Sequence, residues 1–215
     1  MKFGFVGVAT KNYSWRLETS LFLDGLERKR FLMCKMYCCI SMLLSLLIAP
    51  HALYADETTD YHQARTWFNQ ALDGKDDVLD RSMEQFEKLL VAHPENLVYR
   101  SYLGACQTLE GRDAWMPWNK IRYTEKGLDT IDKALDALTL KDDELNIEGV
   151  SSRLVTMLVA ASAFIRVPDH IFHRRAKGKK LLDKIVKHRA YASTPVFFKT
   201  SVQQTLKIFL SQKST

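Results

Sequence analysis

Glycine and proline are scarce in this 215-residue chain, with 9 and 5 copies, and cysteine occurs only four times. Collagen requires glycine at every third position, and small disulfide scaffolds require many more cysteines, so both classes are excluded. Extended disorder is excluded as well, because 47% of the residues are hydrophobic and 26% are charged. We therefore expect a chain that buries a core in one or two globular domains.

The positive charge of the chain is confined to its two ends. The formal net charge is +6, but residues 1–55 carry +4, residues 56–148 carry −9 and residues 149–215 carry +11. A basic isoelectric point therefore gives no general argument for nucleic-acid binding, and we expect no nucleic-acid partner.

An uncharged apolar run, residues 37–49, follows the basic stretch Arg28–Arg30. This order is typical of a secretory signal peptide, and the run is shorter than the roughly 20 apolar residues that a membrane-spanning helix needs. We expect residues 33–55 to be the signal peptide, cleaved after Ala55 or, as the alternative, after Ala52. The mature protein would then be periplasmic or secreted.

Residues 1–32 precede this signal, although the basic start of a secretory signal is normally short. Translation from Met33 or Met36 would give a signal of ordinary length, so we expect residues 1–32 to be a spurious or disordered extension. If the signal is not cleaved, residues 37–49 would anchor the protein in a membrane. We expect membrane contact only through that segment.

Cysteine usage leaves a single thiol in the mature chain. Three of the four cysteines precede residue 56, and only Cys106 follows it, so no internal disulfide can form. Cys106 falls on the apolar side of an expected helix and has no evident base beside it. We expect a buried and unreactive thiol.

Helical periodicity recurs from Asp56 onward, and no alternating pattern of useful length predicts a strand. Thr58 or Thr59 is the expected N-cap of the first helix. The spacing of apolar residues predicts helices at about 58–72, 78–92, 97–109, 121–138, 142–166, 170–187 and 195–210. Gly111 is expected to stop the third of these. Seven antiparallel helices with short connectors favour an all-α solenoid over a closed bundle.

The residues around Pro94 resemble the tetratricopeptide repeat. Phe86 precedes the proline in one helix, and Leu103-Gly104 and Gly111 follow in the next at the offsets of that family, whose glycine allows two paired helices to pack closely. The resemblance implies a right-handed, TPR-like helical domain over residues 56–215.

Such a domain would hold three antiparallel helix pairs and a terminal helix. The pairs are residues 57–92, 97–138 and 143–188, and the terminal helix is residues 195–210. Three repeats are about the minimum at which stacking buries a continuous core.

Residues Arg112–Arg122 depart most clearly from a plain helical repeat. Trp115, Trp118, a proline and four charged residues are unusual for a connector between helices. Aromatic rings beside fixed charges suit a recognition surface. Alternatively, both rings plug the gap beneath an elongated turn, because large aromatic side chains in loops are usually covered.

We expect a binding surface around this insertion, completed by tyrosines of the preceding helix and by one later arginine. Its candidate residues are Tyr99, Tyr102, Arg112, Asp113, Trp115, Trp118, Lys120 and Arg153. The first hypothesis is an exported adaptor that binds a protein or peptide in the groove lined by the first helix of each pair. The second is a small-ligand module, an accessory of an envelope transport system, with a pocket for an anionic or amphipathic molecule at the insertion.

A basic segment follows Pro168. His170 and His173 lie three residues apart, but two histidines are too few for a closed metal site, and five cations follow within Arg174–Lys180. We expect no metal there. The cations form a solvated helix face or dock on the acidic half of the same chain, on an acidic partner or on an anionic membrane.

Signals for catalysis are absent from residues 56–215. The carboxylate pairs Glu144 with Glu148 and Asp129 with Asp132 have the spacing of ordinary surface charges on helices. No zinc-protease motif, phosphate-binding loop, nucleophile elbow or paired-cysteine motif occurs. We expect a protein without catalytic residues and without a cofactor.

Overall fold

A computed structural model describes residues 51–75 and 77–212, with side chains from Glu57 onward. The chain divides into two units, Met1–Ala55 and Asp56–Thr215. The predictions for residues 1–32 and for the apolar run 37–49 lie outside the described residues. The boundary between the units coincides with the predicted cleavage site, and the cleavage itself stays a prediction.

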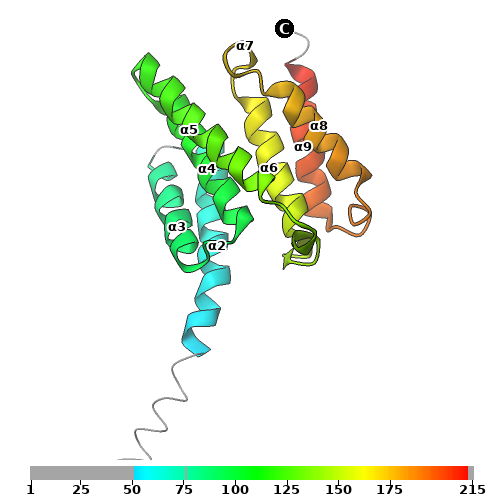
Figure 1. The fold of residues 1–215 in the computed structure, drawn as a ribbon. Helices are drawn as coiled ribbons and strands as arrows, with labels where there is room; N and C mark the ends of the chain where they lie inside the picture. The colour runs from blue at the N-terminus through cyan, green and yellow to red at the C-terminus, as the bar shows by residue number, and fades with distance from the viewer. Residues whose placement is uncertain (1–50, 76, 213–215) are drawn as a thin grey trace, which may run out of the picture. The chain divides into compact units, whose positions relative to one another are not determined.

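Helices dominate the described residues (Figure 1), so the all-α class is confirmed. The elements in chain order are α2 (His51–Leu72), α3 (Leu79–Ala92), α4 (Leu97–Asp113), α5 (Pro117–Asp136), the 3-10 helix η1 (Leu140–Asp143), β1 (Asn146–Ile147), β2 (Val150–Ser151), α6 (Ser152–Arg166), α7 (Asp169–Phe172), α8 (Arg175–Lys187) and α9 (Val196–Ser211). Within the described ranges, no helix combines the length and the apolar character needed to cross a membrane.

Several helix boundaries differ from the predicted ones. α2 begins at His51 and not at Thr58 or Thr59, because the intervening alanine and leucine residues favour helix. α4 continues to Asp113, beyond its predicted end at Leu109. α5 begins early, at Pro117, because the fixed φ of proline suits the first helical position.

Gly111 lies inside α4 and does not end it; its lack of a side chain lets α5 pack closely on this helix. A Cβ atom at Gly111 would lie 2.2 Å from Thr124 Oγ1 of α5, and one at Gly127 would lie 2.5 Å from the carbonyl oxygen of Gly104. These glycines allow the backbones of α4 and α5 to touch. The close packing predicted for Gly104 is thereby confirmed.

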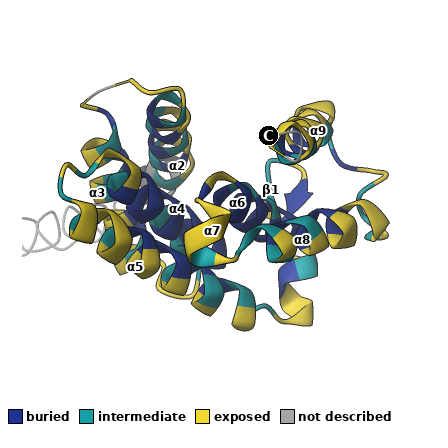
Figure 2. Ribbon diagram, turned by 90° about the horizontal axis from the view of Figure 1, so that it is seen from above, coloured by how far each residue is buried: buried dark blue, intermediate teal, exposed yellow. Residues whose placement is uncertain are grey.

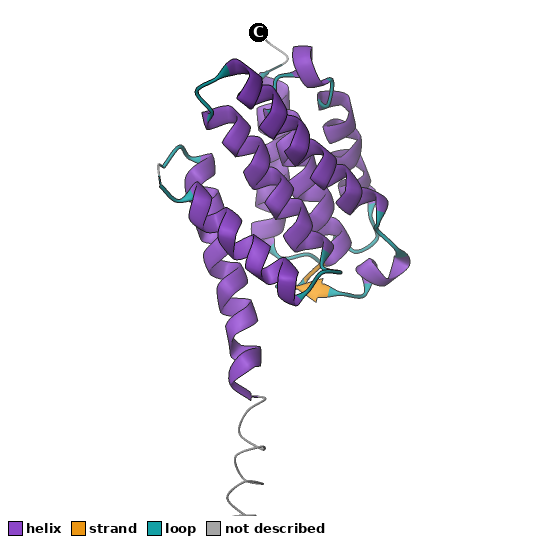
Figure 3. Cartoon of the chain, turned by 60° about the vertical axis from the view of Figure 1, so that its left-hand side comes forward, coloured by secondary structure: helices purple, strands orange, loops and turns teal. Residues whose placement is uncertain are grey.

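The helix predicted over residues 142–166 is wrong in its first ten residues, because α6 begins only at Ser152. Residues 146–151 form an antiparallel hairpin, orange in Figure 3, in which Asn146 pairs with Ser151 and Ile147 with Val150. Gly149 at the hairpin turn has a φ of 81°, a backbone conformation that ends a helix. α6 starts only after Ser151, whose hydroxyl accepts a hydrogen bond from the Leu154 amide.

The basic helix predicted over residues 170–187 is divided in two. His173 has a φ of 52° and ends α7, and α8 begins at Arg175. The terminal helix, predicted over residues 195–210, agrees with α9 to within one residue at each end.

Two central helices organise the core of residues 56–215. Figure 2 shows α4 and α6 in the middle with buried residues on most sides. α4 contacts α3, α5 and α6, and α6 contacts α5, α8 and α9. The buried residues form one continuous cluster, so this unit has a core of its own and meets the main requirement for independent folding.

Aromatic rings attach α2 to the centre. Phe86 of α3 stacks on Tyr102 of α4 with ring centroids 5.0 Å apart, and Phe68 of α2 meets the same tyrosine edge-on at 5.3 Å. The ring centroid of Tyr61 on α2 lies 6.0 Å from that of Tyr102 and 5.5 Å from that of Tyr99. Such pairs add to the free energy gained by burying the rings.

Candidate functional site

A hollow of about 390 Å³ lies between α2, α6 and α9, and we call it the inner hollow. In Figure 2, α2 and α9 stand apart on the same side of α6. Val155 and Val159 of α6 form part of its apolar floor, and Phe197 of α9, 48% exposed, lies at its side. Polar and apolar groups line the inner hollow in about equal parts, so a ligand there would meet both kinds of surface.

The α2 wall of the inner hollow holds a closed ion network. Glu148 of the hairpin accepts from the guanidinium of Arg65, and its other carboxylate oxygen lies 2.9 Å from His62 Nδ1. The Arg65 guanidinium also lies 5.5 Å from the centroid of the Tyr61 ring. These contacts of Glu148 fix the hairpin against α2.

Arg166, the last residue of α6, differs from Arg65. Its Nε donates a 3.3 Å hydrogen bond to Ser162 Oγ, and no ion pair of the described residues includes it. Solvent reaches the side chain, yet partial desolvation lowers the pKa of Arg166, an effect that the nearby Asp73 opposes. The inner hollow is therefore lined by a guanidinium that forms one side-chain hydrogen bond and no ion pair among the described residues, with the Asp73 carboxylate in the same lining.

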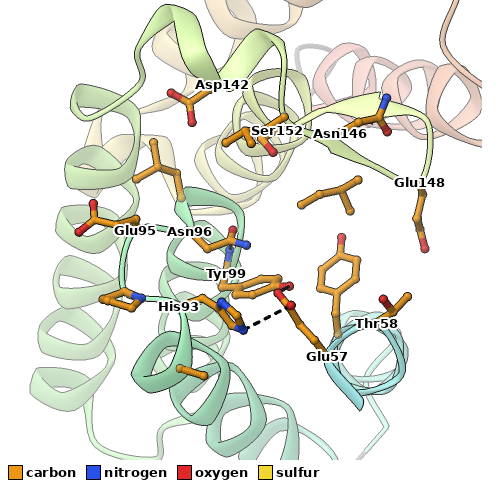
Figure 4. Close-up of a pocket in the computed structure, with 16 residues that line it drawn as sticks. Glu57, Thr58, His93, Glu95, Asn96, Tyr99, Asp142, Asn146, Glu148 and Ser152 are labelled. Carbon is orange, nitrogen blue, oxygen red and sulfur yellow. Dashed lines mark hydrogen bonds and ion pairs between the residues drawn. The ribbon is translucent and has the colours of Figure 1, made fainter. Parts of the chain in front are cut away.

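A second hollow, of about 630 Å³, lies near the start of α4, and we call it the outer hollow. Figure 4 shows Glu57, His93 and Tyr99 turned toward one another on its wall. Tyr99 donates a 2.9 Å hydrogen bond to Glu57 Oε1, and His93 Nε2 lies 3.4 Å from Glu57 Oε2. Burial and the hydrogen bond to Glu57 raise the pKa of Tyr99, so its phenol stays protonated at neutral pH.

Other polar side chains of the outer hollow, among them Asn96, also form hydrogen bonds within the fold. The side-chain oxygen of Asn96 caps α4 by accepting from the amides of Val98 and Tyr99, at 3.1 and 3.2 Å. Asp142 accepts from the backbone amide and the hydroxyl of Thr139, at 2.7 and 3.0 Å. The larger hollow therefore presents polar groups that mainly hold the fold together.

The predicted tryptophan insertion is short and exposed. Only three residues, 114–116, separate α4 from α5. Trp115 is 84% exposed and Trp118 is 63% exposed, so the interpretation of the two rings as a buried plug is wrong. Neither of the two hollows is lined by a residue of this turn.

Three of the predicted site residues do gather at this turn beside the tryptophans. Arg112 forms two hydrogen bonds to Asp113, at 2.6 and 2.8 Å, and a third to the carbonyl oxygen of Ala71 at 3.0 Å. Lys120 Nζ donates to the carbonyl oxygen of Arg112 at 3.0 Å.

The other three predicted site residues lie elsewhere. Tyr102 is buried against the aromatic core and borders the inner hollow, whereas Tyr99 borders the outer one. Arg153 lies at the start of α6, bonded to Asp143 at 2.8 Å and to the carbonyl oxygen of Thr139 at 2.6 Å. The structure therefore does not bring the eight residues together on one surface.

The basic segment after Pro168 makes contacts within the chain. Arg174 and Lys177 lie 2.6 and 2.5 Å from the two carboxylate oxygens of Asp132 on α5. Arg175 donates to the carbonyl oxygens of Phe209 and Gln212, at 2.6 and 3.1 Å, at the end of α9. The predicted pairing with the acidic half of the chain is confirmed for Arg174 and Lys177.

Cys106 has the environment predicted for it. Its side chain is fully buried, and Sγ lies 3.5 Å from the hydroxyl of Ser82. Burial raises the pKa of the Cys106 thiol to about 12, so the reactive thiolate is not populated at neutral pH. Among the described residues, no group of three or more histidine, cysteine and acidic side chains is placed to hold a metal ion.

Sequence reasoning missed Arg166 and Phe197. Arg166 ends an apolar helix, and a single arginine at that position is also an ordinary helix terminus. Arg166 lines the inner hollow and forms no ion pair among the described residues, and only the folded structure shows this. Comparisons of the chain with protein-family models, curated proteins and solved structures found no match.

Proposed function

We propose that residues 56–215 are an exported, non-catalytic binding module, a short TPR-like solenoid that takes a segment of a partner protein in its inner hollow. The observation that carries this proposal is the guanidinium of Arg166, which lines the hollow together with Val155 and Val159 and forms no ion pair among the described residues. The close contact of α4 with α5 at Gly104 and Gly127 supports the repeat architecture. The basic and apolar segments before residue 50 support export.

The chemistry of the inner hollow favours a segment with one carboxylate and one or two apolar side chains. A carboxylate forms paired, charge-assisted hydrogen bonds with a guanidinium. The apolar side chains would cover Val155, Val159 and the exposed part of Phe197, which gains free energy by removing them from water.

A peptide library with free carboxyl ends tests the proposal. The chain from Asp56 onward is used for selection, and the affinity of the selected peptides is then measured by calorimetry. We expect Arg166→Ala to lower that affinity about tenfold or more, because a charge-assisted contact is lost. Val159→Trp should abolish binding by filling the hollow.

Arg122→Ala is the matched control, because Arg122 is an exposed arginine outside the inner hollow. Thermal melting of each variant separates loss of binding from loss of the fold. Selection of no peptide, or peptides bound equally by the parent and by both hollow variants, would overturn the proposal.

A second candidate is a small amphipathic anion in the same hollow. A volume of about 390 Å³ lies within the range of small-molecule pockets. This candidate keeps the accessory small-ligand hypothesis but moves its pocket from the tryptophan turn to the inner hollow. Octanoate that displaces the selected peptide and also binds alone would favour it, whereas octylamine should do neither.

A further inference from the structure

The turn between α4 and α5 presents an exposed aromatic tip. We define this tip as Trp115, Trp118 and Ile121 with Lys120 and Arg122. The two tryptophans are 84% and 63% exposed and Ile121 is 42% exposed, although each has a large apolar side chain. In Figure 1 the tip stands at the free end of the α4–α5 hairpin.

The charge of the tip is opposite to that of its surroundings. Residues 56–148 carry a net −9, but residues 112–123 carry a net +2. Asp113, the single acid among them, is held by Arg112. The Arg122 guanidinium lies 4.9 Å from the centroid of the Tyr123 ring.

From this combination we infer that the aromatic tip docks on an anionic lipid bilayer. Tryptophan is enriched at the membrane–water interface because its ring is apolar and its indole nitrogen is a donor. Each lysine or arginine near an anionic surface adds to the attraction. This surface lies apart from the inner hollow, so the inference does not depend on the proposed function.

The size of the tip favours lipid over a protein partner. A stable protein interface buries about 800 Å² on each partner, which is more than two rings and one isoleucine at the end of a helical hairpin provide. Insertion into an interface requires only that the apolar side chains reach a shallow depth, while the cations stay among the headgroups.

Tryptophan fluorescence gives a direct test. The chain from Asp56 onward contains three tryptophans, and Trp67 is packed against the core. In a Trp67→Phe variant of this chain, all tryptophan fluorescence comes from Trp115 and Trp118. On addition of vesicles of equal parts phosphatidylglycerol and phosphatidylcholine, their emission should shift to shorter wavelength, and co-sedimentation should decrease with added salt.

Replacement of both tip tryptophans by alanine, with Trp67 retained, should lower the vesicle partition coefficient about tenfold or more. The matched control is Leu140→Ala, since Leu140 is 83% exposed at a different turn, and it should change nothing. No binding to these vesicles, or binding that the double variant retains, would overturn the proposal. Absence of lipid binding combined with capture of a protein through the same two tryptophans would also overturn it.

Discussion

The inner and outer hollows differ in how their polar groups are used. The outer hollow is larger, yet Glu57, Tyr99 and His93 on its wall contact one another. The inner hollow is smaller, but Arg166 has no ion-pair partner among the described residues. We base the proposed site on this difference in how the polar groups are used and not on volume.

The same contrast separates the two ends of α6. Arg153 at its start is bonded to Asp143 and to the carbonyl oxygen of Thr139, so it stabilises the fold. The Arg166 side chain at its end forms one hydrogen bond, to Ser162, and no ion pair within the described part of the chain. Two arginines on one helix therefore have different expected roles.

Tyr61 tests whether the two hollows depend on a common wall, since it lines both. Tyr61→Ala should lower the free energy of unfolding by about 3–5 kcal/mol, the usual cost of truncating a buried aromatic side chain. Chemical denaturation measures this loss. Val91→Ala, at an 85% exposed position, should cost no more than about 0.5 kcal/mol. If Tyr61→Ala and Val91→Ala lowered the free energy of unfolding equally, Tyr61 would not be a structural part of the wall that the two hollows share.

Alkaline pH tests the buried aromatic centre between the hollows. Burial raises the pKa of Tyr61 and Tyr102, and it raises the pKa of Cys106 from 9.0 to about 12. The unfolded chain therefore loses these protons at lower pH than the folded chain does. The stability associated with Cys106 is complete below pH 9 and decreases by about 1.4 kcal/mol per pH unit as the pH rises toward 12, whereas the part associated with the two tyrosines begins to decrease only above pH 10.

Melting temperatures between pH 8 and pH 11 measure this decrease. Cys106→Ala should remove the part of the decrease that begins near pH 9, and it should keep the part that tyrosine ionisation adds above pH 10. A melting temperature that stays constant from pH 9 to pH 11 would show that these groups are not buried as described.

Tyr99 tests whether the polar groups of the outer hollow are structural. Tyr99→Phe removes the hydroxyl that donates to Glu57, so the free energy of unfolding should fall by about 1–2 kcal/mol while peptide affinity stays unchanged. Tyr123→Phe, on the outside of α5, is the control and should have little effect on either quantity. Loss of peptide affinity in Tyr99→Phe with unchanged stability would reverse the assignment of the two hollows.

The smallest change in the free energy of unfolding is expected at Arg166, and Arg153 on the same helix is the comparison. Arg166→Ala should alter the free energy of unfolding by no more than about 0.5 kcal/mol, because solvent already reaches the side chain. Arg153→Ala should cost about 1–2 kcal/mol, because it leaves Asp143 and the Thr139 carbonyl without this donor. A larger stability loss for Arg166→Ala than for Arg153→Ala would assign Arg166 a structural role.

The helical class was predictable because apolar residues recur at helical spacing from Tyr61 onward, a signal that depends only on local sequence. Gly104 was also predictable, since its spacing from Pro94 resembles a known repeat. Gly111 was misread as a helix end, because sequence alone does not distinguish a terminating glycine from one that admits a neighbouring backbone.

The site was harder to predict than the fold. The sequence marked Trp115 and Trp118 as unusual residues for a connector. Their exposure depends on the length of the turn, which is only three residues because α4 ends later and α5 begins earlier than predicted. The role proposed for Arg166 depends on side chains that are distant in sequence, such as Phe197, which also lines the inner hollow. Pairwise packing of this kind leaves no periodic signal along the chain.

The most direct test is the affinity of one selected peptide for two variants, Arg166→Ala in the inner hollow and Glu57→Gln in the outer hollow. We predict that Arg166→Ala lowers the affinity about tenfold or more while Glu57→Gln leaves it unchanged. An affinity that falls in Glu57→Gln and is unchanged in Arg166→Ala would contradict the assignment of the binding site to the inner hollow.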